Sequence, residues 1–129
     1  MIKTLDHIIV AVNNLEEAEQ NYQKILGISS SWRGHHKEWG TSNSLFSFQN
    51  TYLELLAATG EGMGAQLVKN KIKNDGEGLM GIVLGTDDLE AVRNKLIALG
   101  YSLPSQSNGE GINTNNNSKR SWVNQFLPI

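Results

Sequence analysis

The sequence contains no cysteine. Disulfide bonds, thiolate metal sites and cysteine nucleophiles are therefore excluded, so any metal ligand has to come from His, Asp or Glu. No run approaches the roughly 18 apolar residues that a membrane-spanning helix needs. The N-terminal residues enter a strand-like pattern directly, without a signal-peptide core. These features predict a cytoplasmic protein that has no membrane partner.

An excess of positive charge is also missing. Eleven Lys and Arg residues face thirteen Asp and Glu residues, which gives a formal net charge of −2. The three tryptophans are not interleaved with a basic stripe, so nucleic acid is not an expected partner. Phosphate-binding loops, dinucleotide fingerprints and nucleophile elbows are absent from the sequence. With 129 residues, of which 39% are hydrophobic, the chain is expected to form one globular domain.

The clearest pattern in the sequence is an internal repeat. Residues 5–12 form a short, β-branched apolar run, and a helical pattern that ends at Gly27 follows it. The same strand–helix pattern returns at residues 79–90, and a second helical pattern ends at Gly100. Two copies of one supersecondary unit are therefore expected.

The remaining elements are predicted from shorter patterns. Strands are expected at 30–33, 44–49 and 52–57, and the last two should form a hairpin through Asn50 and Thr51. The glycine-rich connector contains a short helix at about 65–73. In the C-terminal part we expect strands at 101–104 and 121–126. The Ser/Asn/Gly-rich residues 106–117 are expected to form a flexible loop.

Three stretches of the sequence carry a family resemblance. They are Leu5–Val12, Gly34–Asn43, which contains the pattern G-x-H-x-x-W-G-T-x-N, and Thr51–Leu56. Together with the repeat, they resemble the vicinal oxygen chelate superfamily, in particular its glyoxalase-like branch, beside glyoxalase I, extradiol dioxygenases and bleomycin-resistance proteins.

The resemblance implies an α+β fold of paired βαβββ modules whose curved sheet encloses a small-molecule cavity. Module one would span residues 1–58, the connector 59–78 and module two 79–129. Module two lacks its last strand when the strands at 79–85, 101–104 and 121–127 are counted. An unpaired sheet edge is usually covered. Either a partner subunit covers it, as in a homodimer, or the chain is the front part of a longer protein, which we favour slightly.

The resemblance also implies metal ligands at His7 and Glu54, since these positions match the ligands of metal-dependent members. An imidazole and a carboxylate suit a divalent cation. Gly81 stands at the counterpart of His7, however, so half of the expected ligands are missing. Two interpretations stay open: an incomplete or dimer-completed metal site, or a metal-free pocket in which His7 and Glu54 bind each other or a ligand. Glu54 is also the candidate general base, with a pKa raised by burial.

The Gly34–Asn43 stretch gives four further candidates for substrate binding. His36 matches the histidine of the family pattern, Trp39 could stack on a flat substrate, and Thr41 and Asn43 could donate or accept hydrogen bonds. The alternative is an ordered structural loop, in which Trp39 caps the core and Thr41 and Asn43 hold the turn.

Three functions remain open from the sequence. The first is a glyoxalase-like lyase, isomerase or oxygenase that acts on a small oxygenated metabolite. The second is a non-catalytic protein that sequesters a small molecule, as the bleomycin-resistance relatives do. The third is a degenerate interaction domain of a longer chain. The fold itself does not select among them, because one fold can host many chemistries.

Overall fold

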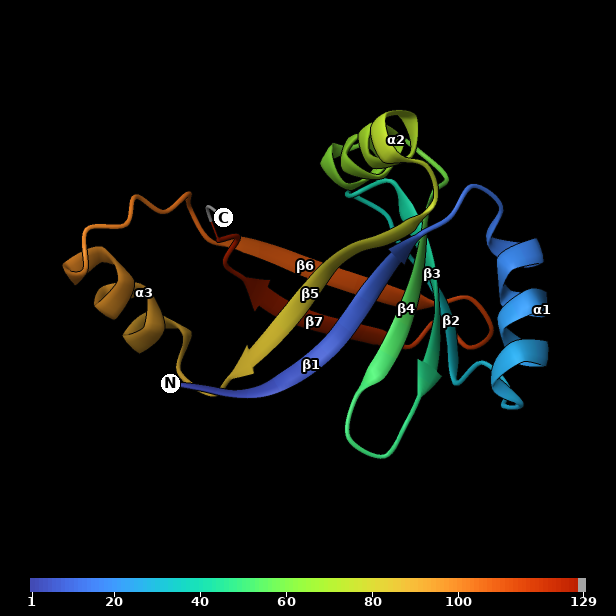
Figure 1. Ribbon diagram of the computed structural model, residues 1–129, viewed down its shortest axis with the longest axis horizontal. Coiled ribbons are helices and arrows are strands. Elements are labelled where there is room, and N and C mark those ends of the chain that lie inside the picture. Colours follow the sequence, from blue (N-terminus) through green and yellow to red (C-terminus); the bar gives the residue numbers. More distant parts are fainter. Residues whose placement is uncertain (128–129) are drawn as a thin grey trace.

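The computed structural model describes residues 1–127 as one strongly curled sheet of seven strands with three helices (Figure 1). The elements follow in this order along the chain: β1 (Ile2–Ala11), α1 (Leu15–Leu26), β2 (Trp32–His36), β3 (Thr41–Ser47), β4 (Tyr52–Ala58), α2 (Met63–Asp75), β5 (Gly78–Thr86), α3 (Leu89–Ala98), β6 (Ser107–Asn113) and β7 (Lys119–Asn124). The α+β fold and the βαβββ unit expected from the sequence are confirmed.

The order of the strands across the sheet is β5-β1-β4-β3-β2-β6-β7. β1 and β4 are parallel, and every other neighbouring pair is antiparallel. The sheet curls so far that β6 and β7 lie behind β1 and β5 in the view of Figure 1. As a result, one face of the sheet is turned inward and the other outward.

The outward face of the first unit packs against α1. Asn14 caps this helix by accepting a hydrogen bond from the Glu17 backbone N–H at 3.0 Å, and Gly27 ends it with a left-handed φ of 70°. Phe46 and Leu55 are fully buried beneath the helix. Leu53 and Leu55 therefore share the face of β4 that packs on α1, and Glu54 lies on the other face.

Backbone hydrogen bonds hold the turn between β2 and β3 against the connector that leads into α2. Gly40 has a φ of 71°, and the backbone N–H groups of Thr59 and Gly60 both donate to its carbonyl oxygen at 3.0 Å. A Cβ on Gly40 would lie 2.6 Å from the backbone of Glu61. Glycine is required at this position because the two chain segments are in contact. The helix predicted at 65–73 is confirmed and is two residues longer at each end.

The second unit differs from the prediction in its C-terminal part. Residues 101–104 form no strand, and the expected loop at 106–117 contains β6 instead. The segment Ser107–Asn113 has no apolar alternation, so its strand results from pairing with β2 and β7. Within residues 1–127 the second unit has three strands. No helix in this part of the chain is long and apolar enough to span a bilayer.

Candidate functional site

The inward face of the curled sheet gathers most of the residues that the sequence singled out. His7 pairs with Tyr52 across β1 and β4, and Asn43 pairs with Leu56 across β3 and β4. Residues paired across neighbouring strands share a face, and so do alternate residues along a strand. His7, Glu54, Asn43, Thr41 and His36 therefore lie on one face, opposite the residues that pack on α1.

Glu54 is the centre of a short hydrogen-bond network. Its Oε2 atom accepts from Asn43 Nδ2 at 2.7 Å, and its Oε1 atom lies 3.3 Å from His7 Nε2. The other ring nitrogen of His7 lies 2.8 Å from Asp6 Oδ2. A protonated imidazole donates from both nitrogens. His7 is thus placed to bridge a half-exposed carboxylate and a buried one.

The pKa values of this pair move in opposite directions. Burial raises the pKa of Glu54, but the hydrogen bonds from His7 and Asn43 outweigh burial and hold it below its ordinary value. Burial lowers the pKa of His7, but hydrogen bonds to Glu54 and Asp6 outweigh it and raise the pKa. The sequence-based expectation of a raised Glu54 pKa is therefore wrong, because it counted burial and not the donors. Both shifts favour an ionised Glu54 carboxylate beside a protonated His7 ring.

His36 differs from His7. Its Nδ1 lies 2.8 Å from Thr41 Oγ1, and its Nε2 lies 3.4 Å from Asn43 Nδ2. Burial and the neighbouring His35 lower its pKa against the opposing effect of Glu54. A neutral ring that donates to Thr41 and faces the Asn43 amide satisfies these contacts. Thr41, His36 and Asn43 therefore hold one another in place beside Glu54.

Asn43 has one polar atom left over. Its Oδ1 is buried and, among the described residues, has no hydrogen-bond partner. Buried polar atoms are rarely left in this state without a reason. An N–H or O–H group of a bound ligand would satisfy it, which makes Asn43 a candidate for ligand contact as well as for holding Glu54.

Four residues of this face escaped the sequence analysis. The Tyr52 ring stacks on the His7 ring with centroids 4.4 Å apart, and Trp122 meets the His36 ring edge-on at 5.8 Å. The Arg120 guanidinium lies 5.4 Å from the centre of the Trp32 ring. Tyr52 could have been found, since it lies two residues before Glu54 on the same strand. Arg120 and Trp122 on β7 could not have been found in this way, because only the curl of the sheet brings β7 to this site.

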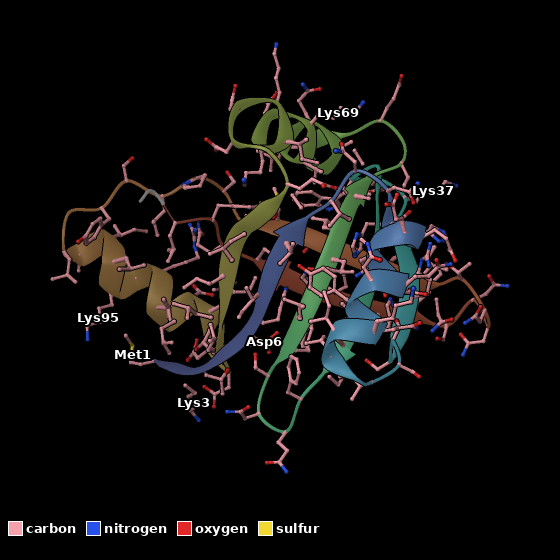
Figure 2. All side chains as sticks on the ribbon, turned by 45° about the vertical axis from the view of Figure 1, so that its right-hand side comes forward. Met1, Lys3, Asp6, Lys37, Lys69 and Lys95 are labelled. Carbon is pink, nitrogen blue, oxygen red and sulfur yellow. The ribbon has the colours of Figure 1, made fainter. Side chains whose placement is uncertain are left out.

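Arg120 places a positive charge on the inward face. Burial and the charges of Asp6 and Glu54 raise the pKa of Tyr52, and the Arg120 charge opposes them. Among residues 1–127, no carboxylate lies within ion-pair distance of Arg120. Figure 2 shows Asp6 on β1, beside β4.

Trp39 lies apart from this group. It belongs to the turn between β2 and β3, its indole N–H donates to the Asn108 carbonyl at 3.3 Å, and its ring packs on Phe126 at 6.1 Å. It lines an open cleft of about 480 Å³ together with Lys37 and Trp122. Neither His7 nor Glu54 lines that cleft, so the proposed role of Trp39 in binding the same ligand as Glu54 has no contact to support it.

A divalent cation is the group that the family resemblance implies here. His7 and Glu54 offer two donor atoms, and one atom of each residue is already hydrogen-bonded elsewhere. Within residues 1–127, no cluster of three or more His, Cys, Asp or Glu side chains could hold a metal ion. Structural and catalytic zinc sites use three or four protein ligands. The residues present do not make a complete metal site, and metal binding at His7 and Glu54 stays a prediction.

Comparisons with known proteins agree on the type of domain. A family model of the glyoxalase-like domain matches residues 5–126. The ethylmalonyl-CoA/methylmalonyl-CoA epimerase of Cereibacter sphaeroides is 30% identical over 100 residues, which cover 78% of this chain and 73% of that protein.

Solved structures show the same fold at lower identity. The methylmalonyl-CoA epimerase of Mycobacterium tuberculosis is 18% identical with a TM-score of 0.71, and the match covers 95% of this chain and 87% of that one. A variant of the Streptomyces coelicolor epimerase, in complex with 2-nitronate-propionyl-CoA, is 18% identical with a TM-score of 0.72, covering 95% and 94%. A hypothetical protein from Staphylococcus aureus reaches a TM-score of 0.75 at 22% identity, covering 96% and 52%.

Proposed function

This chain belongs to the glyoxalase-like domain family, and we propose on that premise that it is an isomerase that moves a proton on a small oxygenated metabolite, with Glu54 as the base. One observation carries the proposal: a buried carboxylate, on the inward face of the sheet, is kept ionised by hydrogen bonds from His7 and Asn43. An ionisable group whose state is set by burial and specific partners, on the concave face of a sheet, is a candidate for catalysis.

The proposed step is a proton transfer at the carbon next to a carbonyl group. Glu54 takes the proton, the C–H bond breaks, and its electron pair moves toward the carbonyl oxygen to give an enolate. To invert the carbon, a proton from solvent then reaches it from the opposite face while Glu54 releases its own proton to solvent; alternatively, Glu54 gives its proton to a neighbouring carbon. No oxidant or reductant is consumed in either case. His7 holds the carboxylate in position and stabilises its ionised form before the transfer.

The name of the 30%-identical relative supports a substrate class. That protein is named for ethylmalonyl-CoA and methylmalonyl-CoA, which are thioesters with one free carboxylate on the reacting carbon. Both acyl groups withdraw electrons and acidify that carbon's hydrogen. Arg120, which faces the same site without a carboxylate partner among the described residues, would bind the free carboxylate. We therefore propose a short branched acyl-CoA of this type.

The experiment follows the optical activity of an enantiomerically pure methylmalonyl-CoA in the presence of the purified protein. The wild type should racemise the substrate, and Glu54→Gln should slow this by at least about 100-fold, the usual contribution of a positioned general base. Glu61→Gln, a change at an exposed connector position, is the matched control and should leave the rate unchanged. Equal rates for wild type and Glu54→Gln would overturn the assignment of Glu54.

A second candidate is a sequestering protein of the bleomycin-resistance type. The observation that favours it is the aromatic lining of the inward face, where the Arg120 guanidinium lies over the Trp32 ring and Trp122 meets the His36 ring. Such a protein would bind an anionic aromatic ligand with equal affinity in the wild type and in Glu54→Gln, and would not racemise methylmalonyl-CoA. The cytoplasmic location and the homodimer expected from the sequence are part of the proposal in either case.

A further inference from the structure

The helix α2 lies over the end of the sheet at which β1 and β4 end, and Figure 2 shows Lys69 on this helix. A cleft of about 320 Å³ opens there between α2 and the two strand ends. Its lining residues are Val12, Asn13, Ala58, Val68, Lys69, Ile72 and Lys73. We propose that this cleft binds an organic phosphate monoester with a short alkyl group. The proposal does not depend on the isomerase activity, because neither His7 nor Glu54 lines the cleft.

One part of the lining is apolar. Val12 and Val68 are buried, and Ala58 and Ile72 are half-buried. These four side chains come from α2, from the last residue of β4 and from the residue that follows β1. An alkyl group that packs against them leaves water, which is the main source of affinity for such a group.

The position of the cleft follows from the way in which α2 is anchored. The Ala65 backbone N–H donates to the Trp39 carbonyl oxygen at 2.8 Å, and a Cβ on Gly64 would lie 3.0 Å from the Trp39 side chain. Small residues thus bring the N-terminal end of α2 into contact with the turn between β2 and β3. The residues of α2 that line the cleft lie beyond this contact, from Val68 onward.

Two lysines give the cleft its charge. Lys69 and Lys73 are four residues apart on α2 and therefore lie on one face of the helix. Among residues 1–127, neither lysine has a carboxylate within ion-pair distance. Two like charges at this spacing repel each other. An anion bound between the two ammonium groups would remove that repulsion.

The stability of the helix itself does not explain Lys69. Lys71 donates to the Gly76 carbonyl oxygen at 2.9 Å and so binds the chain where α2 ends. Lys73 lies in the last turn, where the helix dipole favours a positive charge. Lys69 lies one turn earlier, where the effect of the dipole has faded. The placement of Lys69 beside Lys73 therefore suits an anion better than it suits the helix alone.

The charge of the lining selects a phosphate. No acidic residue lines the cleft, and the Glu77 carboxylate, which follows α2, accepts from the Asn13 backbone N–H at 2.7 Å. A phosphate monoester carries close to two negative charges at neutral pH, which match two ammonium groups, whereas a carboxylate carries one. Lysine is a common ligand of phosphate. The cleft is at the lower end of the volumes of small-molecule sites, so the alkyl group has to be short.

The test is a titration of the isotope-labelled chain with hexyl phosphate, followed in amide correlation spectra. Saturable changes should be confined to the residues around the cleft, in particular Asn13 and Val68–Lys73. Inorganic phosphate lacks the alkyl group and hexanol lacks the charge, so each should bind at least about tenfold more weakly than hexyl phosphate. Hexanoate has the alkyl group but a single charge, and it should also bind more weakly.

Protein variants locate the site. Lys69→Gln and Lys73→Gln should each weaken hexyl phosphate binding by at least about fivefold, since each removes one charge-assisted contact. Lys95→Gln removes an exposed lysine of α3, is the matched control and should leave binding unchanged. Glu54→Gln should also bind as the wild type does, which separates this site from the isomerase proposal.

Four results would each overturn the proposal. They are equal affinities for inorganic and hexyl phosphate, hexanoate binding as tight as that of hexyl phosphate, spectral changes scattered over the surface without saturation, and undiminished binding by a protein that carries both Lys69→Gln and Lys73→Gln.

Discussion

Glu54 is the central residue of the candidate site. Its protonation state depends on two neighbouring side chains and not on burial alone. Burial alone would favour the neutral acid, but the Asn43 amide and the His7 ring both hydrogen-bond the charged form. The charged form of His7 is stabilised in turn, because it lies beside the carboxylates of Glu54 and Asp6. His7 and Glu54 are therefore most stable as an ion pair, and replacing one of them should shift the pKa of the other.

Replacement of Asn43 tests this dependence. Asn43→Ala leaves Glu54 Oε2 without its 2.7 Å donor, so we expect the free energy of unfolding at neutral pH to fall by about 1–3 kcal/mol. Urea denaturation measures it. Asn50→Ala, in the exposed turn between β3 and β4, is the control and should change stability by less than about 0.5 kcal/mol. An Asn43→Ala protein as stable as the wild type would show that the amide does not support the carboxylate.

The pH dependence of stability tests His7. A raised folded pKa means that the His7 contribution is complete below its ordinary value of 6.5 and is lost as the pH rises through the folded pKa. The lowered Glu54 pKa means that its contribution is complete above 4.5 and is lost as the pH falls through the folded pKa. The stability difference between wild type and His7→Gln should therefore be largest between about pH 4.5 and 6.5.

Denaturation of both proteins across a pH series measures that difference. The effect of His36, whose lowered pKa acts in the opposite sense, is present in both proteins and largely cancels. A difference that grows steadily above pH 7 would contradict a raised His7 pKa.

At the scale of the elements, the sequence predicted the helices and strands whose apolar pattern and capping residues lie within one short stretch of chain. The β1–α1 and β5–α3 units repeat one apolar pattern with one capping chemistry: Asn14 and Asp88 each accept from the backbone N–H three residues later. β6 was missed because its residues carry no apolar alternation. Gly109 and Gly111 lie where the Trp122 ring covers the backbone, so β6 depends on contacts that are distant in sequence.

The glycine at the β2–β3 turn gives a test at this scale. Gly27 and Gly40 have nearly equal φ values of 70° and 71°, but a Cβ meets nothing within 4 Å at Gly27 and lies 2.6 Å from the Glu61 backbone at Gly40. Gly27→Ala should cost about 1–2 kcal/mol for the left-handed conformation alone. Gly40→Ala should cost clearly more, because the connector must also move. Equal losses in urea denaturation would mean that the two segments are not in tight contact.

At the scale of the whole molecule, the curl of the sheet makes the site. His7, His36, Thr41, Asn43 and Glu54 were predicted from the three stretches of sequence that carry the family resemblance. Arg120 and Trp122 were not predicted, because they come from a strand at the far edge that reaches the site only through the curl. Among residues 1–127, β5 and β7 are the outermost strands of the sheet, and the sequence had indicated a strand missing from the second unit.

Arg120 tests whether the two ends of the sheet act together on one substrate. Arg120→Gln should raise KM for an acyl-CoA with a free carboxylate by about tenfold, equivalent to about 1.4 kcal/mol of binding. The value of kcat should change little, because Glu54 is untouched. Lys119→Gln removes a neighbouring charge from the same strand and is the control. Steady-state kinetics separates the cases, and an unchanged KM in Arg120→Gln would exclude the guanidinium from substrate binding.

The central claim is that Glu54 moves a proton between the substrate carbon and itself, and the most direct measurement is the mass of recovered methylmalonyl-CoA after incubation with the protein in D₂O. A carboxylate base exchanges the proton it has taken with solvent, so the wild type should add one deuterium to the substrate, and Glu54→Gln should add it at least about 100-fold more slowly. Substrate recovered from the wild type without added deuterium and with unchanged optical activity would contradict the account.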